Sequence, residues 1–246
     1  PADRLDLLAD LQASVDAIAA FSGLAEARRY RAFCQQARST YETLEPSFIS
    51  ANRPDHPLAL MARVLRQGIP GVRGLASIQP FQGLWQALGR YFHDPRLRQL
   101  FGRYATYCGS SPFSAPATLM LVAHVERQAV WQVEGGLHRL AQALASAAQR
   151  HGATLRYCSP VHMIRLTRGR ASGVLLASGE VLEAEAVLFN GDADALSQGL
   201  LGPAVQTALG AQPLAPAQRS LSALTWHQVA TPVGLALSHH NVFFCD

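Results

Sequence analysis

Lysine is absent from this chain of 246 residues, and all 21 basic residues are arginine. Charged residues make up only 15% of the sequence, whereas an ordinary soluble domain has about 25%. The arginines are scattered along the chain, which argues against the clustered basic stripe of a nucleic-acid-binding domain. The formal net charge is +4, and the surface of an anionic membrane is a better match for such a charge.

Cysteine is also scarce, and long apolar runs are missing. The four cysteines form no C-x-x-C pair, so neither a zinc site nor a dithiol motif is indicated. Reduced thiols in a cytoplasmic compartment are the expectation, because no signal peptide precedes them. No apolar run reaches the length of about 18 residues that a membrane-spanning helix needs. Hydrophobic residues still make up 49% of the chain, enough for a core and a site for an apolar ligand.

Self-contained catalytic motifs are missing as well. The sequence contains no G-x-G-x-x-G turn, no Walker loop and no G-x-S-x-G elbow. His124 and Glu126 have the H-x-E spacing of zinc deaminases, but the P-C-x-x-C half of that motif is absent. His239 and His240 are adjacent in an expected strand, so their side chains would point to opposite faces. We therefore predict no metal site and expect a bound cofactor to supply the chemistry.

The first half of the chain has the pattern of helices. Apolar residues recur every three or four positions from Leu5 to Ile18, as on one face of a helix. Pro46 should interrupt a second helix, because proline lacks the backbone N–H. The expected helices cover about residues 5–18, 24–44, 58–65, 82–92, 95–106 and 115–127.

The second half mixes one amphipathic helix with short strands. A helix over 136–149 has Leu137, Leu140 and Leu144 on one side. A β-meander follows, with turns at Arg168-Gly169 and Ser178-Gly179. The expected strands are about 154–157, 161–166, 173–177, 184–190, 220–229, 233–238 and 241–245, with a helix at 192–200. This order suggests an α/β (α+β) segment joined to a mainly helical region.

Several ordered motifs resemble one family. They are Tyr91–Tyr107, Gly109–Pro116, His124-Val125-Glu126, Trp131, Glu134–Leu137, Ala186–Asp192 and His239–Phe244. In this order and spacing they resemble the phytoene desaturase family of FAD-dependent carotenoid desaturases. The sequence of Phe101–Pro116 is most similar to the hydroxyneurosporene (methoxyneurosporene) desaturase branch. The resemblance covers most of residues 80–246.

The resemblance implies a two-domain flavoprotein with an FAD/NAD(P)-binding Rossmann-like fold, of which this chain is an internal fragment. The nucleotide-binding glycine turn would precede Pro1, and the fragment alone should bind FAD weakly or not at all. Residues 1–133 would form the helical, membrane-associating substrate region, and 134–200 part of the FAD-binding domain. Residues 201–246 would begin a second sheet of the substrate domain. The implied activity is dehydrogenation of an acyclic carotenoid, with hydride passing to the flavin.

The same resemblance suggests where ligands bind. Val161 and the run Asn190-Gly191-Asp192 would lie beside FAD. The candidate substrate-cavity residues are Phe81, Trp85, Phe101, Leu119, Leu121 and Trp131, each of which could equally be a core residue. Arg66 aligns with a basic residue near the flavin, but Arg63 replaces the acidic neighbour expected one helical turn earlier. An exposed helical arginine is therefore an alternative role for Arg66.

Three other functions remain open at this point. A carotene isomerase or ketolase of the same fold would share these motifs, and a membrane-associated polyene-binding protein without catalysis would share the composition. An amine-oxidase-like enzyme would need charged or aromatic-cage residues around a polar substrate. For the leading hypothesis we expect a carotenoid substrate and a peripheral position on the cytoplasmic face of a bacterial inner membrane.

Overall fold

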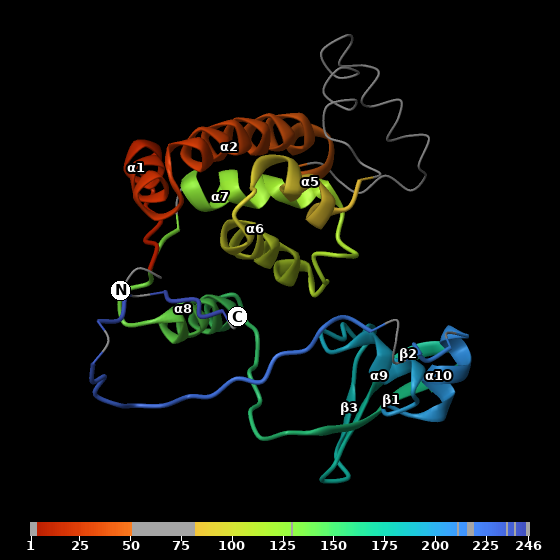
Figure 1. Cartoon of the computed structure of the whole chain (residues 1–246). Coiled ribbons are helices and arrows are strands. Elements are labelled where there is room, and N and C mark those ends of the chain that lie inside the picture. The colour runs from red at the N-terminus through yellow and green to blue at the C-terminus, as the bar shows by residue number, and fades with distance from the viewer. Residues whose placement is uncertain are drawn as a thin grey trace.

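The computed structural model describes residues 4–50, 82–128, 130–210, 212–215, 219–234, 236–238 and 240–244. Figure 1 shows a bundle of the helices α1, α2, α5, α6 and α7, and a smaller group made of a three-stranded sheet with α9 and α10. Helix α8 stands apart from both groups (Figure 1). The expected helix at 58–65, Arg66 and Phe81 lie outside the described residues.

The bundle is formed by the N-terminal elements. Its α-helices are α1 (Leu11–Ser22), α2 (Leu24–Leu44), α5 (Leu84–Tyr91), α6 (Pro95–Gly102) and α7 (Val122–Gln128). A π-helical turn (Glu45–Ile49) and two 3-10 turns (Arg103–Cys108 and Ala117–Leu121) complete it. Among the described residues, no helix is both long enough and apolar enough to span a membrane.

Helix α1 begins later than its apolar spacing predicts. The side chain of Asp10 caps it by accepting a 2.7 Å hydrogen bond from the Ala13 N–H. The hydroxyl of Ser14 bonds both the N–H and the carbonyl of Leu8, at 2.8 Å each. The expected start at residue 5 was therefore wrong, because the backbone of Leu8 is held by a side chain instead of by a helical turn. Gly23, with φ of 92°, ends α1 and precedes α2.

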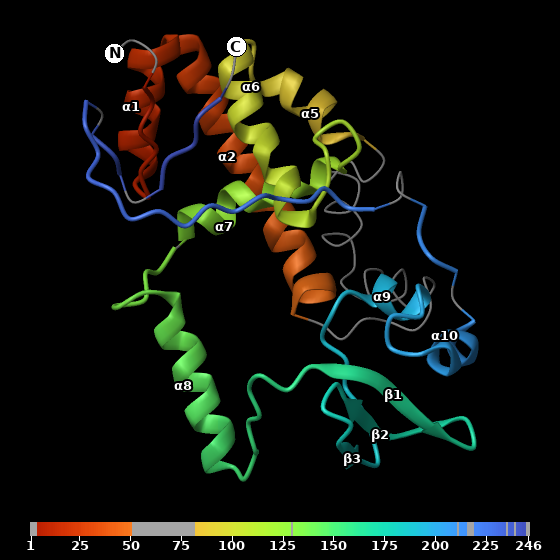
Figure 2. The same ribbon diagram turned by 90° about the horizontal axis from the view of Figure 1, so that it is seen from below.

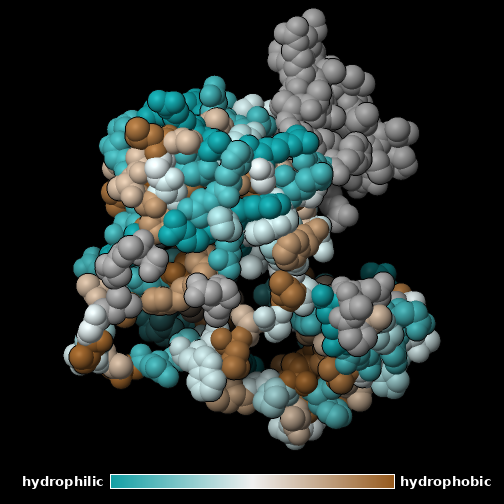
Figure 3. Space-filling model, in the orientation of Figure 1, coloured by the Kyte–Doolittle hydropathy of each residue, from teal (hydrophilic) through white to brown (hydrophobic). Residues whose placement is uncertain are grey.

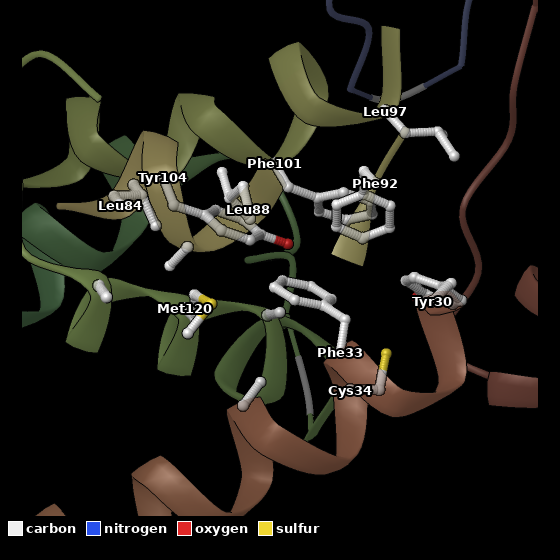
Figure 4. Packing of buried hydrophobic residues seen from close by; sticks show 14 of the residues in the cluster. Tyr30, Phe33, Cys34, Leu84, Leu88, Phe92, Leu97, Phe101, Tyr104 and Met120 are labelled. Carbon is white, nitrogen blue, oxygen red and sulfur yellow. The ribbon is translucent and has the colours of Figure 1, made fainter. Parts of the chain in front are cut away.

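Helix α2 has the predicted bounds, and its buried face forms one side of the core. Figure 4 shows the rings of Phe33, Phe92 and Phe101 directed toward one another. The centroid of Phe101 lies 4.7 Å from that of Phe92 and 5.0 Å from that of Phe33, within the range of favourable aromatic pairs. Tyr30 adds a fourth ring, stacked 5.6 Å from Phe101. Because these residues come from α2 and from the α5–α6 region, the ring cluster joins two distant parts of the chain.

The predicted helix over 95–106 is α-helical only as far as Gly102. Asp94 caps it by accepting from the Arg96 N–H at 2.9 Å, and Pro95 occupies the first helical position. Beyond Gly102 the chain tightens into a 3-10 turn that ends at Gly109, whose φ is 61°. The predicted helix over 115–127 likewise opens with a 3-10 turn before α7.

The β-meander is confirmed. Strands β1 (Val161–Thr167), β2 (Arg170–Leu176) and β3 (Val181–Glu183) form an antiparallel sheet in that order. Helices α9 (Ala193–Ser197) and α10 (Pro203–Leu209) follow it. Gly173 pairs with Glu183, and a Cβ there would lie 2.1 Å from the Leu182 carbonyl oxygen. Glycine is therefore required where β2 approaches β3 this closely.

Other predicted strands were wrong. No strand occurs over 154–157 or 184–190, nor at the described residues of 220–229, 233–238 and 241–245. A strand needs a neighbour that takes up its backbone hydrogen bonds, and the sheet in the described parts of the chain contains only β1, β2 and β3. The described residues do not confirm the Rossmann-like arrangement, which stays a prediction. What is present is a mixture of helices with a small antiparallel sheet.

The extended C-terminal segment instead runs below the helical bundle in Figure 1 and passes in front of α7 in Figure 2. It is attached at few points. The Leu221 N–H donates to the Gly109 carbonyl at 2.8 Å, and the guanidinium of Arg4 donates to the Ala236 carbonyl at 3.2 Å. Its apolar side chains remain exposed, Trp226 and Phe243 among them.

Helix α8 (Leu137–Arg150) agrees with the predicted helix but buries none of its residues. Leu137, Leu140 and Leu144, which were expected on one face, are 75%, 48% and 64% exposed. Figure 3 shows brown, apolar residues exposed in the lower half of the view, where Figure 1 places α8 and the sheet. This apolar stripe therefore has no packing partner among the described residues.

Candidate functional site

A partly buried charge network joins the 3-10 turn after α6 to α7. The carboxylate of Glu126 accepts hydrogen bonds from the hydroxyls of Tyr104, at 3.0 Å, and Tyr107, at 2.8 Å. It also accepts two from the guanidinium of Arg103, at 3.0 and 3.1 Å. The Arg103 guanidinium carbon lies 5.0 Å from the centroid of the Tyr104 ring, close enough for a cation–π contact.

Burial sets the electrostatics of this network. Burial and then the nearby Glu126 charge hold the pKa of Tyr104 well above its ordinary value. Burial on its own lowers the pKa of Arg103, but Glu126, Tyr104 and Tyr107 together outweigh that effect, and the pKa is raised. Tyr104 is therefore a neutral donor and Arg103 a permanent cation. Arg103, Tyr104 and Tyr107 all donate hydrogen bonds to the Glu126 carboxylate, so the arrangement connects the 3-10 turn firmly to α7.

In the sequence, Glu126 was marked by its H-x-E spacing and by the His124-Val125-Glu126 motif of the family resemblance, with no role predicted for its side chain. His124, the histidine of that motif, contacts other residues than Glu126 does. His124 lies against the ring of Tyr41 at 5.1 Å and hydrogen-bonds Gln128 at 2.9 Å. Within the parts of the chain that the structure describes, no three His, Cys, Asp or Glu side chains are grouped to hold a metal ion. An arginine and two tyrosines within five consecutive residues were the available signal for a buried carboxylate partner.

The predicted substrate-cavity residues lie in different surroundings. Phe101 is 1% exposed inside the ring cluster of the core. Trp85 is half-buried between the Arg98 guanidinium, 4.2 Å from its ring, and the Phe113 ring, 5.1 Å away. Leu119 and Leu121 are half-buried at the 3-10 turn before α7. Trp85, Leu119 and Leu121 therefore lie at the edge of the bundle and Phe101 in its interior.

Trp131 lies in the segment of the chain that follows α7 and precedes α8, and it is 87% exposed. A tryptophan side chain has a large apolar area, so leaving it in water loses the favourable free energy that its burial would contribute. It is not brought into contact with Trp85 or Phe101 by any ring pairing among the described residues. Its role as a cavity wall stays a prediction.

The residues expected beside a flavin are at the surface. Val161 begins β1 and is 42% exposed, and Asn190 and Gly191 are exposed before α9. A Cβ at Gly191 would lie 2.3 Å from the ring of Phe189, so this glycine already serves a contact within the chain. The Asp192 carboxylate caps α9 by accepting from the Asp194 N–H at 2.9 Å.

These surface residues fit only part of a dinucleotide. They offer exposed backbone and one carboxylate, but they contain no run of glycines whose N–H groups could bind a pyrophosphate. Among the described residues, a flavin site is therefore incomplete.

Comparison with known proteins identifies the class. Residues 51–231 match the family described as flavin containing amine oxidoreductase. The chain belongs to this family of flavin-dependent oxidoreductases.

Within that class its similarities are to carotenoid enzymes. It is 51% identical over 241 residues to a hydroxyneurosporene desaturase of Rubrivivax gelatinosus, covering 98% of this chain and 45% of the relative. It is 43% identical to the hydroxyneurosporene desaturase of Cereibacter sphaeroides, covering 98% of this chain and 48% of the relative. A phytoene desaturase of Fusarium fujikuroi is 29% identical, covering 98% and 41%. The chain thus spans about half the length of the curated relatives it matches.

Proposed function

We propose that the complete protein desaturates an acyclic carotenoid, such as hydroxyneurosporene or methoxyneurosporene, with FAD as its cofactor. The identity of 51% over nearly the whole chain to a hydroxyneurosporene desaturase carries this proposal. The identity of 43% to a second protein of that name supports it. A bound flavin supplies a hydride acceptor, which no side chain can replace.

The residues of this chain would serve substrate and cofactor in different ways. The half-buried side chains Trp85, Leu119 and Leu121, with Trp131, would contact the polyene, which offers few polar handles. Val161 and Asn190-Gly191-Asp192 would approach the flavin nucleotide, and the pyrophosphate would be bound outside this chain. Arg66, Phe81 and Phe101 remain assigned to the site by the family resemblance alone.

We also propose that the complete protein works on the cytoplasmic face of a bacterial inner membrane as a peripheral protein. An acyclic carotenoid dissolves in lipid and not in water, so an enzyme at the bilayer surface meets it directly. The net charge of +4 is of the sign that anionic lipids attract.

Product analysis tests the activity. The complete protein would be incubated separately with hydroxyneurosporene, neurosporene and phytoene in lipid vesicles, and the products separated by chromatography and mass. We expect loss of two hydrogen atoms per double bond formed, with hydroxyneurosporene the best substrate and no product after removal of flavin. A product of unchanged mass would indicate an isomerase, and one with added oxygen a ketolase. Substrate that binds without any product would overturn the enzymatic proposal.

A further inference from the structure

A small cationic hollow lies between α2 and α7, away from the Glu126 network. It is lined by Arg38 of α2 and by His124, Arg127 and Gln128 of α7, and its volume is about 110 Å³. Pockets for drug-sized ligands are larger, about 300–1,000 Å³. The hollow therefore suits one small group and not a nucleotide or a polyene.

One of the residues that line this hollow has an unused donor, which is itself closed off from solvent. The Nε–H of Arg127 is buried and has no hydrogen-bond partner among the described residues. Buried donors are nearly always satisfied in native proteins, so an orphan points to an acceptor that is missing. The thiol of Cys34 faces the guanidinium of Arg127, and it is a weak acceptor at best.

The charges around the hollow have one dominant sign. Burial lowers the pKa of His124, and the nearby charges of Arg127 and Arg38 lower it further. Glu42 is the carboxylate near the rim, and it pairs with Arg38 at 2.7 Å where both side chains are more than half exposed. Such an exposed pair is weak, so it leaves Arg38 available to a ligand.

We propose that this hollow binds a single phosphate-class oxyanion. Two guanidinium groups can each donate paired hydrogen bonds to phosphate oxygens, a geometry that arginine matches well. Gln128 and His124 supply a neutral amide and an imidazole beside them. The phosphate could belong to a lipid headgroup or be free in solution. The chemistry is the same, and the experiment separates the two sources.

Inorganic phosphate is the first probe. The melting temperature of the complete protein would be recorded against phosphate concentration at constant ionic strength, with sodium chloride as the compensating salt. A ligand that binds only the folded state raises the melting temperature with its concentration. We expect such a rise in the wild type. A response no larger than that to chloride would overturn the proposal.

Two variants locate the site. Arg127→Gln removes the orphan donor, and Arg38→Gln removes a rim guanidinium whose exposure makes misfolding unlikely to interfere. Arg28→Gln is the matched control, because it removes the same charge from an exposed position on the same helix. Losing one charged hydrogen-bond pair should weaken phosphate binding about tenfold. Equal phosphate affinity in Arg38→Gln and Arg28→Gln would contradict the assignment.

Vesicles then identify the source of the phosphate. Sedimentation with phosphatidylglycerol vesicles would be compared for Arg38→Gln and Arg28→Gln, with phosphatidylcholine as the neutral lipid. A weaker pull-down for Arg38→Gln only, reversed by free phosphate, supports a lipid headgroup. A melting temperature that rises with phosphate, together with equal vesicle binding by Arg38→Gln and Arg28→Gln, supports a free phosphate. The visible absorbance of flavin in each preparation is recorded separately, so a failure of the proposed desaturase activity is distinguishable from a failure of this site.

Discussion

The hydroxyl of Tyr104 donates a 3.0 Å hydrogen bond to the carboxylate of Glu126 from a side chain that is only 2% exposed. A buried phenol without a partner would be costly, and a half-buried carboxylate is stabilised by every donor that reaches it. This one bond therefore fixes the 3-10 turn after α6 to α7. The same carboxylate holds Arg103, whose side chain is 18% exposed.

Removing the Glu126 carboxylate should lower the free energy of unfolding more than removing the Tyr104 hydroxyl. Tyr104→Phe loses one hydrogen bond to a charged group, and we expect a loss of about 1–2 kcal/mol in the free energy of unfolding. Glu126→Ala leaves Arg103 and two tyrosines without their acceptor, and we expect about 2–3 kcal/mol. Urea denaturation followed by circular dichroism measures both. Glu185→Ala, at an exposed position, is the control and should change stability by less than about 0.5 kcal/mol.

Asp94 should make the stability depend on pH in the acid range. Hydrogen bonds from Arg96, and also from Ser22, lower the pKa of Asp94 from 3.8 to about 2. A lowered folded-state pKa means that the charged form stabilises the fold above about pH 4. This contribution is lost as the pH falls from about 4 to about 2. We expect it to be roughly 1–2 kcal/mol, because Arg96 is half exposed and solvent screens the pair.

Two variants at Asp94 separate charge from capping. Asp94→Asn keeps a side-chain oxygen for the helix cap but cannot titrate. Its stability should not show the Asp94 step between about pH 4 and about pH 2. Asp94→Ala should lose the cap as well, at a further cost of about 1 kcal/mol at neutral pH. Identical pH profiles for wild type and Asp94→Asn would show that another group titrates.

The position of Phe101 predicts a large effect on stability. Its ring is enclosed by those of Phe33, Phe92 and Tyr30, so truncation leaves a cavity that the core cannot easily fill. Phe101→Ala should cost about 3–5 kcal/mol. Phe113→Ala, at a ring that is 71% exposed, should cost much less. Equal losses in the thermal midpoint would show that the aromatic cluster is loosely packed.

For Trp131 we expect little effect on stability and a large effect on activity. Its side chain is 87% exposed, so Trp131→Ala should leave the melting temperature nearly unchanged. If it contacts the polyene in the complete protein, the variant should lose about tenfold or more in kcat/KM for hydroxyneurosporene, since a buried aromatic contact contributes more than about 1.4 kcal/mol. Tyr157→Ala, at a side chain that is 75% exposed, is the matched control. Unchanged kcat/KM would remove Trp131 from the substrate site.

Local sequence patterns predicted the elements whose bounds depend on residues near them in the chain. The apolar spacing predicted α2 and α8, and Asp94-Pro95 predicted the start of α6, because caps and helix faces are short-range features. The delayed start of α1 was not predictable in this way. It depends on the Ser14 hydroxyl bonding the backbone of Leu8, and serine at that position is compatible with many other structures.

Long-range partners explain what the sequence did not predict. Residues 184–190 are apolar enough for a strand, yet without a neighbouring strand the same residues stay irregular. Phe101 is equally suited to a cavity wall or to a core, and only its ring neighbours, which include Phe33 and Phe92, place it in the core. The Glu126 network needed Arg103 and α7 to be close in space, which spacing along the chain does not show.

The ring cluster also sets an order of events during synthesis. Two ring partners of Phe33, Phe92 and Phe101, lie 59 and 68 positions later in the chain (92 − 33 and 101 − 33). At about 5–20 residues per second, the ribosome needs roughly 3–14 seconds to add them. For that interval the part of the apolar side of α2 that later packs against Phe92 and Phe101 is made but not yet covered by them. We therefore expect the nascent chain to depend on chaperone shielding until the α6 segment leaves the exit tunnel.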